Sequence, residues 1–392
     1  MGRAREILAA ALLLAVACDD RASSSSAPAG PSASIECPGT PAGTVRVASV
    51  QAPRRLVRLR YPTARVGSEG LSALGWTALD SAAAARLSPG DVLASEVDGL
   101  ATSGSVPTDP RMGEQWHHAA VGAPQAWARV EGRSLPAIAV IDSGVFTVHP
   151  ELGTQVLPGW SFLTGTSDTS DQLGHGTTVS GTCAAKADNG LGGAGVAFGA
   201  QVVPLVVLDA GDRAWYSDIA RAIVYAADQG IRIINVSVGG ETASDVLQSA
   251  VDYAWARGCV VFASAMNRGS TVPQYPAACE RVVAVGAVDW AGRLASFSGR
   301  GPWVDLVAPG QSILTTVGAH CFGYKNGTSY ASPIVASVAA LILAARPELG
   351  AQALVDLITA TCDDLGDPGV DDLFGAGRVN AARAVAAALT GM

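Results

Sequence analysis

Four polar residues in this chain have side chains of the types that carry out acyl transfer. Ser329, in NGTSYASP, is a hydroxyl nucleophile at the start of a long apolar run. His175, in GHGTTVSG, is a general base, and Asp142, in AVIDSGV, is a carboxylate that can orient an imidazole. Asn267, in ASAMNRG, offers an amide N–H for a developing oxyanion. Brought together, they could hydrolyse an ester or an amide bond.

Each of these residues also has a structural interpretation when it is taken alone. Ser329 could be only the N-cap of the helix that follows it. Asp142 could be a cap or a hydrogen-bond acceptor at the end of a strand, and Asn267 a turn residue in a loop. His175 differs because glycine flanks it on both sides, which lets backbone or substrate approach the imidazole. The catalytic interpretation therefore depends on a fold that gathers the four side chains.

Apolar runs typical of buried strands alternate with helical patterns through the part of the chain that carries these residues. Because parallel neighbouring strands need helical crossovers, this alternation predicts an α/β fold with a mostly parallel sheet. Ligands in such folds lie beyond the carboxyl ends of the strands, where Asp142 and Asn267 are expected. The run from Asn326 to Ala345 predicts a buried helix whose N-terminus presents Ser329. We expect Pro333 in its first turn, where no N–H is needed.

The chain resembles the subtilisin-like serine peptidases, or subtilases. AVIDSGV, GHGTTVSGTCAA and NGTSYASP are similar to the family's Asp, His and Ser motifs, and they follow in the family's order. INVSVGG resembles one wall of its specificity pocket, and GAGRVNAARAV its closing helix. The resemblance runs from about Val106 to about Leu389 and implies a three-layer subtilisin-like fold. It also implies an endopeptidase with the triad Asp142, His175 and Ser329 and the oxyanion donor Asn267.

Three residues depart from the usual family pattern. Met266 stands where glycine usually precedes the oxyanion asparagine. Thr178 replaces a second histidine, and Tyr330 replaces a frequent methionine after the serine. Met266 is the departure that could reshape the site, and it keeps open the alternative of a catalytically silent binding protein with this fold. A second alternative is an esterase or lipase, although the nucleophile of such enzymes precedes the acid and the histidine in the chain.

The resemblance also implies where a peptide substrate binds. One segment would pair with an extended peptide as an added strand and would also form one wall of the specificity pocket. The end of a second strand would form the opposite wall. Neither segment contains an acidic residue, so we expect an apolar or aromatic side chain before the cleaved bond. The residues of the two segments are Ser237, Val238 and Gly239, and Ala263, Ser264 and Ala265.

No cofactor is expected for the chemistry, but a structural calcium ion is. The loop KADNGLGGAGVA resembles the family's calcium loop and contributes Asn189. Asp109 and Glu151 fall at matching outer positions, although the family usually has aspartate where Glu151 stands. Such oxygen ligands suit Ca²⁺. The alternative is a glycine-rich connector without a metal ion.

The N-terminal end has the features of an export signal. Residues 1–18 place Arg3 and Arg5 before an apolar run, the pattern of a signal peptide. The segment resembles a bacterial lipoprotein signal in which Cys18 becomes the lipidated first residue, and cleavage elsewhere with free secretion is the alternative. Residues 19–44 are rich in Ser and Pro and are expected to be a disordered tether. We therefore expect an exported protein, lipid-anchored in the cell envelope or extracellular.

Residues 45–105 predict a small α+β module that precedes the peptidase domain, residues 106–392. VRVASV, LVRLRY and DVLASEV read as strands, and SALGWTALDSAAAARL reads as a helix. By its position and outline the module resembles the family's inhibitory pro-segment, and a permanent accessory domain is the alternative. We expect self-cleavage between about Val97 and Val106.

Composition limits the other functions of the chain. Apolar residues make up 49% of it, which supports one large core, and the length suits a large domain with a small one. The net charge of −8 and the lack of a basic run argue against a nucleic-acid partner. After residues 1–18, no apolar run is expected to cross a membrane. We expect a monomer whose partners are polypeptide substrates and its own pro-segment.

Seven cysteines in an exported chain suggest disulfide bonds. Cys259 and Cys279 each precede a strand-like run, and neighbouring strands would bring them together, so this pair is the first expectation. Cys321 with Cys362 is the second. Cys183 lies in an apolar, helical stretch and is expected to be a buried free thiol. The cysteines lack the close paired spacing of a zinc site.

Overall fold

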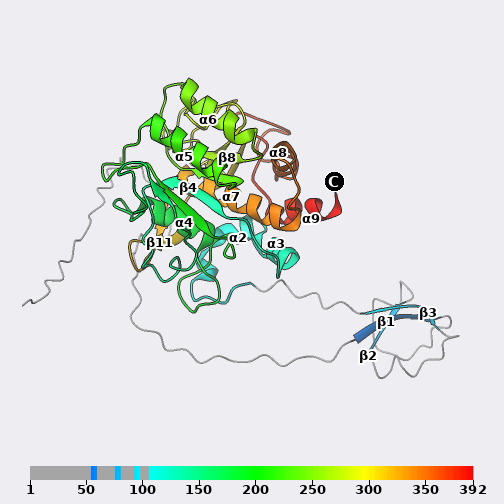
Figure 1. Cartoon of the computed structure of the whole chain (residues 1–392). Helices are drawn as coiled ribbons and strands as arrows, with labels where there is room; N and C mark the ends of the chain where they lie inside the picture. Colours follow the sequence, from blue (N-terminus) through cyan, green and yellow to red (C-terminus); the bar gives the residue numbers. More distant parts are fainter. Residues whose placement is uncertain (1–53, 60–75, 81–91, 98–105, 392) are drawn as a thin grey trace, which may run out of the picture. The chain divides into compact units, whose positions relative to one another are not determined.

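The computed structural model describes residues 54–59, 76–80, 92–97 and 106–391 of the 392-residue chain (Figure 1). The predicted signal peptide, residues 1–18, and the tether, residues 19–44, lie outside the described residues. The expected cleavage region between Val97 and Val106 lies outside them as well. The domain boundaries therefore stay predictions.

A seven-stranded sheet forms the centre of the region that begins at residue 106. Its strands are β4 (Ile138–Asp142), β5 (Trp160–Ser161), β6 (Val202–Val206), β7 (Ile233–Val236), β8 (Val260–Ser264), β9 (Val282–Val288) and β10 (Leu306–Pro309). They follow the order β10-β9-β8-β7-β4-β6-β5, and all neighbouring pairs are parallel. The predicted α/β fold with a mostly parallel sheet is confirmed.

The remaining elements of this region are mostly helices. They are η3 (Met112–Glu114), α2 (Trp116–Ala120), α3 (Ala123–Val130), α4 (His175–Ala184), α5 (Tyr216–Asp228), α6 (Asp245–Trp255), α7 (Thr328–Ala345), α8 (Ala351–Ala360) and α9 (Ala381–Thr390). A separate antiparallel hairpin consists of β11 (Ile313–Val317) and β12 (Cys321–Lys325).

Helices cover both faces of the sheet, so the region has three layers (Figure 1). Alternate residues of β4 show this, because neighbouring side chains on a strand point to opposite faces. Ile138 and Val140 belong to the apolar cluster that contains α7, α3 and α9, whereas Ala139 and Ile141 belong to the one that contains α5 and α6. The three-layer fold predicted from the family resemblance is confirmed.

Helix α7 lies in the core, with all 18 of its residues buried. Of the described helices it alone is long and apolar enough to cross a membrane, which the sequence analysis did not expect, but burial inside the protein marks it as a core helix. The helix begins at Thr328, so Pro333 lies inside it, and the expectation that Pro333 occupies the first turn is wrong.

Three short strands before residue 106 form an antiparallel sheet in which β1 (Arg54–Leu59) lies between β2 (Trp76–Asp80) and β3 (Val92–Val97). The strands expected at β1 and β3 are present. Residues 76–80 were expected to be helical, and that prediction is wrong. They pair with β1 along their length, and this ladder outweighs the helix propensity of the alanine-rich segment.

Both expected disulfide bonds are wrong, because Cys259, Cys279 and Cys362 carry free, buried thiols. The register of β8 and β9 pairs Val261 with Val282, so Cys259 would align with residue 280 and not with Cys279. The Cys362 thiol donates to the carbonyl of Ile358 at the end of α8. Cys183 is a buried free thiol, as expected.

Candidate active site

Asp142 is the only charged residue in the seven strands of the described central sheet, and it occupies the carboxyl end of β4. Its side chain is 1% exposed. The ring of His175, the first residue of α4, places Nδ1 2.8 Å from Asp142 Oδ1 and 3.0 Å from Oδ2. Because a carboxylate only accepts, Nδ1 is the donor, and Nε2 keeps a free lone pair. A buried charge in this sheet is therefore paired with an imidazole.

The charge of Asp142 also changes the basicity of His175. Burial by itself lowers the pKa of the imidazole, but the negative charge of Asp142 and its hydrogen bond outweigh burial. Asp212 and Asp171 add smaller contributions of the same sign, and the pKa of His175 ends above its ordinary value of 6.5. The site therefore stabilises the imidazolium that forms when His175 takes a proton.

Two residues that the sequence pattern did not single out hold this pair in place. Ser143 donates its N–H to Asp142 Oδ1 at 2.7 Å and its hydroxyl to Asp171 Oδ1 at 2.8 Å. The other oxygen of Asp171, which is 2% exposed, accepts from the N–H and the hydroxyl of Thr177 at 2.9 and 2.6 Å. Asp171 thus fixes the start of α4, where His175 sits. An acid four residues before His175, at a helix start, was the available signal.

The glycine after His175 is required by close backbone packing. A Cβ on Gly176 would lie 2.2 Å from the carbonyl oxygen of Gly144, which follows β4. The Gly176 N–H donates to the Ser143 hydroxyl at 2.9 Å. The expected close approach of backbone is found at Gly176, where it holds α4 against the end of β4, whereas a Cβ on Gly174 would meet open space.

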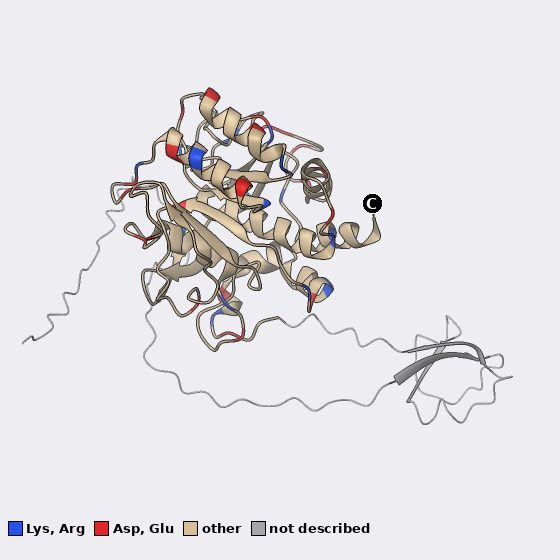
Figure 2. Cartoon of the chain, viewed as in Figure 1, with Lys and Arg blue, Asp and Glu red and all other residues tan. Residues whose placement is uncertain are grey.

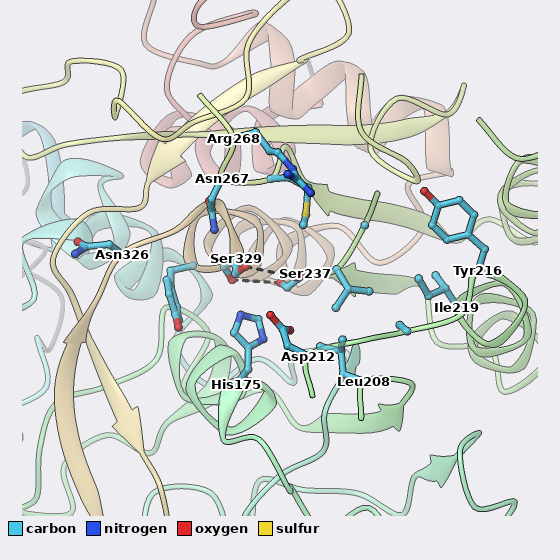
Figure 3. A pocket seen from close by; sticks show the side chains of 15 residues that line it. His175, Leu208, Asp212, Tyr216, Ile219, Ser237, Asn267, Arg268, Asn326 and Ser329 are labelled. Atoms are coloured by element: carbon cyan, nitrogen blue, oxygen red, sulfur yellow. Dashed lines mark hydrogen bonds between the residues drawn. The ribbon is translucent and has the colours of Figure 1, made fainter. Parts of the chain in front are cut away.

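Ser329 is the second residue of α7 and lines the same cleft as His175, a cleft of about 390 Å³ (Figure 3). Its hydroxyl lies 3.4 Å from the carbonyl oxygen of Ser237. Because Ser329 belongs to the first turn of α7, its backbone N–H has no partner within the helix. Gly327 precedes this turn at φ 152°, and a Cβ there would lie 3.2 Å from Asn267 Nδ2.

Pro333 removes the helix N–H that would bond the carbonyl of Ser329. The hydroxyl of Ser237 donates to this carbonyl instead, at 3.2 Å. Asn235, which is fully buried in β7, donates to the Ser237 hydroxyl at 2.9 Å and accepts from the Ser332 hydroxyl at 2.7 Å. This network, which sequence analysis did not find, fixes the position of α7 on β7 and so the position of Ser329.

Asn267 follows β8 and directs its amide towards the start of α7. Its Oδ1 accepts from the N–H of Thr328 at 2.8 Å and from the Thr328 hydroxyl at 3.0 Å. These two bonds fix which end of the amide is oxygen, so Nδ2 is the end left to donate. Asn267 lines the cleft with Ser329 and His175 (Figure 3). A carbonyl oxygen bound there could receive hydrogen bonds from the Asn267 amide and the Ser329 N–H.

The three departures from the family motifs have identifiable places. Met266 adopts φ 61°, in the left-handed region that glycine occupies without strain. Its sulfur lies 3.5 Å from the Ser264 hydroxyl. Thr178 and Tyr330 contact each other, with their hydroxyl oxygens 3.3 Å apart, and the Tyr330 ring lies 6.1 Å from the His175 ring. The last two departures thus form one packed pair beside the imidazole.

Not all of the residues expected to bind substrate reach the cleft. The segment that follows the end of β7 lines the cleft with Ser237, Val238 and Gly239. At the other wall, Met266 lines the cleft. The three residues expected there are buried beneath that surface, and their role in binding stays a prediction; they are Ala263, Ser264 and Ala265.

The expected calcium ligands lie close together. Asp109 accepts three backbone N–H bonds from residues 188–190 of the loop, at 2.7 to 3.0 Å. Asn189 donates its amide to Glu151 Oε2 at 3.0 Å. Glu151 is fully buried, its Oε1 has no hydrogen-bond partner among the described residues, and burial raises its pKa to about 8. Within the described residues, no group of three or more His, Cys, Asp or Glu side chains could hold a metal ion.

These observations test the fit of a calcium ion at this loop. The unpartnered Oε1 of Glu151 is a hard oxygen ligand in a buried place, which fits Ca²⁺. Three of the roughly four acceptor sites of the Asp109 carboxylate are used by the loop backbone, so this carboxylate closes the loop and has one site left for a cation. The residues present thus fit a cation that binds beside Glu151.

A parallel α/β sheet that places a carboxylate, an imidazole and a hydroxyl beside one cleft is the arrangement of a serine hydrolase. A model of the subtilase family of peptidases matches residues 134–377. The chain belongs to this family, whose members are serine endopeptidases.

Similar proteins of this family are known in sequence and structure. A thermophilic serine proteinase of Bacillus sp. (strain AK1) is 43% identical over 260 residues, which are 66% of this chain and 64% of that protein's length. Thermitase of Thermoactinomyces vulgaris is 39% identical over 280 residues, which are 71% of this chain and 99% of thermitase. The structure of a protease from Pseudoalteromonas arctica matches with a TM-score of 0.67 and 33% identity, over 72% of this chain and 100% of that one.

Proposed function

We propose that this protein is an exported serine endopeptidase that cleaves peptide bonds through an acyl-enzyme. The observation that carries the proposal is the cleft shared by Ser329 and His175, with His175 Nδ1 2.8 Å from the buried carboxylate of Asp142. A serine that served only as a helix N-cap would not need a histidine paired with a buried carboxylate in the same cleft. The family membership supports the same activity.

The chemistry follows from the roles of these side chains. A serine hydroxyl is a weak nucleophile at neutral pH, so His175 Nε2 would accept the proton as Ser329 Oγ attacks the carbonyl carbon. His175 would then pass this proton to the leaving amine, and a water molecule would release the acyl group by the reverse sequence. Asp142 would hold the required tautomer and stabilise the imidazolium.

The oxyanion of the tetrahedral intermediate would receive two hydrogen bonds. Asn267 Nδ2 would supply one, and the Ser329 backbone N–H at the start of α7 would supply the other. The N-terminal end of α7 also carries the positive end of the helix dipole, which favours negative charge there. Both donors are held in place before substrate binds, because Asn267 Oδ1 is bonded to Thr328.

Ser237, Val238 and Gly239 support the choice of an endopeptidase. They continue past the last paired residue of β7 along the cleft. An extended peptide can lie beside such a segment as an added strand, with several residues on each side of the cleaved bond. Ala263, Ser264 and Ala265 would support the second wall beneath Met266.

The Ser329→Ala protein tests this function. We expect a fluorophosphonate probe to label the wild type and not the variant, and peptide cleavage to fall by at least about 10³-fold. Ser249→Ala, on the exposed face of α6, is a matched control that should keep both labelling and cleavage. A common thermal midpoint would show that the variants are folded. An unlabelled wild type would indicate a silent subtilase, and cleavage of esters without internal peptide bonds would indicate an esterase.

We also propose functions for the N-terminal parts of the chain. Residues 45–105 would be a pro-segment that the peptidase removes by its own activity, and residues 1–18 a signal peptide. The same Ser329→Ala protein should then remain full-length, whereas the wild type shortens between about Val97 and Val106. Mass spectrometry of both purified proteins would also report whether Cys18 carries a lipid. Trimming of the variant at the wild-type position would contradict self-processing.

We also propose a structural calcium ion that Glu151, Asp109 and Asn189 would hold. It would neutralise a buried carboxyl and take no part in bond cleavage. Binding at a hundred times the dissociation constant stabilises a protein by about 2.7 kcal/mol, so the thermal midpoint should fall by about 5–10 °C when EDTA removes the ion. Glu151→Gln should lose most of this response, and Glu348→Gln, which is exposed, should keep it. An equal midpoint with millimolar calcium and with EDTA would rule out the ion.

A further inference from the structure

One carboxylate in the cleft has no role in the chemistry described above. Asp212 lies in the loop between β6 and α5 and lines the cleft together with His175 and Leu208. Figure 3 shows its carboxylate beside the imidazole ring. The residue sits at φ 59°, and its N–H donates to the carbonyl of Asp209 at 3.1 Å, so it closes a tight turn at the edge of the cleft.

The neighbouring cations are bound to other acids. Arg213 directs Nε and Nη2 to the carboxylate of Asp209 at 3.1 and 2.9 Å. Arg268, which also lines the cleft, places Nε 3.2 Å from Glu241. Within the described residues the Asp212 side chain makes no hydrogen bond and no ion pair. The loops and outer helices around the sheet carry charges of both signs (Figure 2).

Asp212 is exposed at the edge of the cleft, so its charge is open to a bound substrate. Partial burial raises the pKa of Asp212, and the charges of Asp142 and Asp209 act in the same direction, while His175 opposes them. A cationic group of a bound substrate would meet an exposed carboxylate to which no cation of the described residues is bonded, and the two would form an ion pair at the edge of the cleft. Leu208, at 4% exposure beside it, offers an apolar contact for an aliphatic stem.

The direction of an extended substrate determines which of its side chains reaches Asp212. In the proposed binding mode the first residue before the cleaved bond directs its side chain between Val238, Gly239 and Met266. Side chains of an extended chain alternate, so the second residue before the bond points to the opposite side. His175, Leu208 and Asp212 lie together on one side of the cleft, across from Asn267 and Arg268 (Figure 3).

We propose that Asp212 selects substrates with a lysine or arginine as the second residue before the cleaved bond. The inference rests on the proposed peptidase function. It adds a charge requirement at a position next to the apolar or aromatic residue expected immediately before that bond.

The test compares peptides that differ only at the second residue before the bond, with Lys, Met or Glu. For the wild type we expect kcat/KM to be about threefold to fivefold higher with Lys than with Met, and lower still with Glu. Asp212→Asn should bring the Lys to Met ratio to about one, and Asp212→Glu should restore part of it. Raising NaCl to 1 M should reduce the wild-type ratio, because salt screens an exposed ion pair.

Asp218→Asn is the matched control. Asp218 lies on α5, its carboxylate is paired with Arg221 at 2.9 Å, and it does not line the cleft. It should leave the ratio unchanged. An equal Lys to Met ratio in the wild type and in Asp212→Asn would overturn the inference. So would a shift of the pH profile, equal for all three peptides, with no change of ratio, because Asp212 would then act only on His175. Cleavage of the Met peptide by both proteins would leave the proposed function standing in either case.

Discussion

The Asp142→Asn enzyme should turn over peptide substrates about 10⁴-fold more slowly than the wild type, with KM nearly unchanged. The carboxylate bonds His175 Nδ1 at 2.8 Å and only accepts, so it keeps the proton on Nδ1 and leaves Nε2 free to act as a base. An asparagine amide can donate to Nδ1 instead and so favour the wrong tautomer. The imidazolium also loses its counter-charge.

The loss should appear in kcat, because Asp142 is buried behind His175 and is absent from the lining of the cleft. Burial lowers the pKa of His175, and without the charge of Asp142 this effect is no longer outweighed. The acidic limb of the pH profile should therefore move to lower pH. Asp289→Asn, a buried carboxylate paired with Arg293 outside the cleft, should leave kcat unchanged. A tenfold or smaller loss of kcat in Asp142→Asn would remove Asp142 from this role.

The sequence was most informative where short-range patterns, such as apolar strand runs and flanking glycines, mark the residues of the site. Buried parallel strands are short apolar runs, and Asp142 interrupts this pattern as the one charge in the central sheet. The glycines on both sides of His175 indicated close approach, and the structure shows that a Cβ on Gly176 would meet the backbone of Gly144. These signals depend on neighbours in the chain, so they can be read without the fold.

Other features depend on contacts between distant segments and could not be predicted in this way. The carbonyl of Ser329, which Pro333 leaves unpaired within the helix, accepts from the hydroxyl of Ser237, 92 residues earlier in the chain. The pairing of cysteines depends on strand register, which the apolar pattern of two fully buried strands does not specify. Residues 76–80 form a strand because β1 pairs with them.

The partners of charged residues in loops were the hardest feature to predict from the sequence. Asp212 and Asp209 lie three residues apart in one loop, and nothing in the sequence shows which of them pairs with Arg213. The structure assigns the ion pair to Asp209 and leaves Asp212 in the cleft. Specificity was therefore harder to predict than mechanism, because it depends on which polar group remains without a partner.

Asn267→Ala should lower kcat by about 10²–10³-fold and change KM much less, because the oxyanion forms only after substrate has bound. This magnitude is the one known for subtilisin, a member of the same family, and is carried over to this chain. The complication is that Asn267 has a second contact. Its Oδ1 accepts from the N–H and the hydroxyl of Thr328, so its loss could also loosen the start of α7.

Asn267→Asp separates the two roles, because a carboxylate keeps the acceptor for Thr328 and lacks the N–H donor. If Asn267 donates to the oxyanion, both variants should lose kcat, and Asn267→Asp should lose at least as much while the thermal midpoint stays close to that of the wild type. Asn380→Ala is the control, since its Oδ1 accepts from the N–H of Arg383 at 3.0 Å at the start of α9, and it does not line the cleft. A large loss in Asn267→Ala with near-normal turnover in Asn267→Asp would show that Asn267 only anchors α7. The left-handed backbone of Met266 would then have no bearing on the oxyanion, because the residue that it orients would not be a donor.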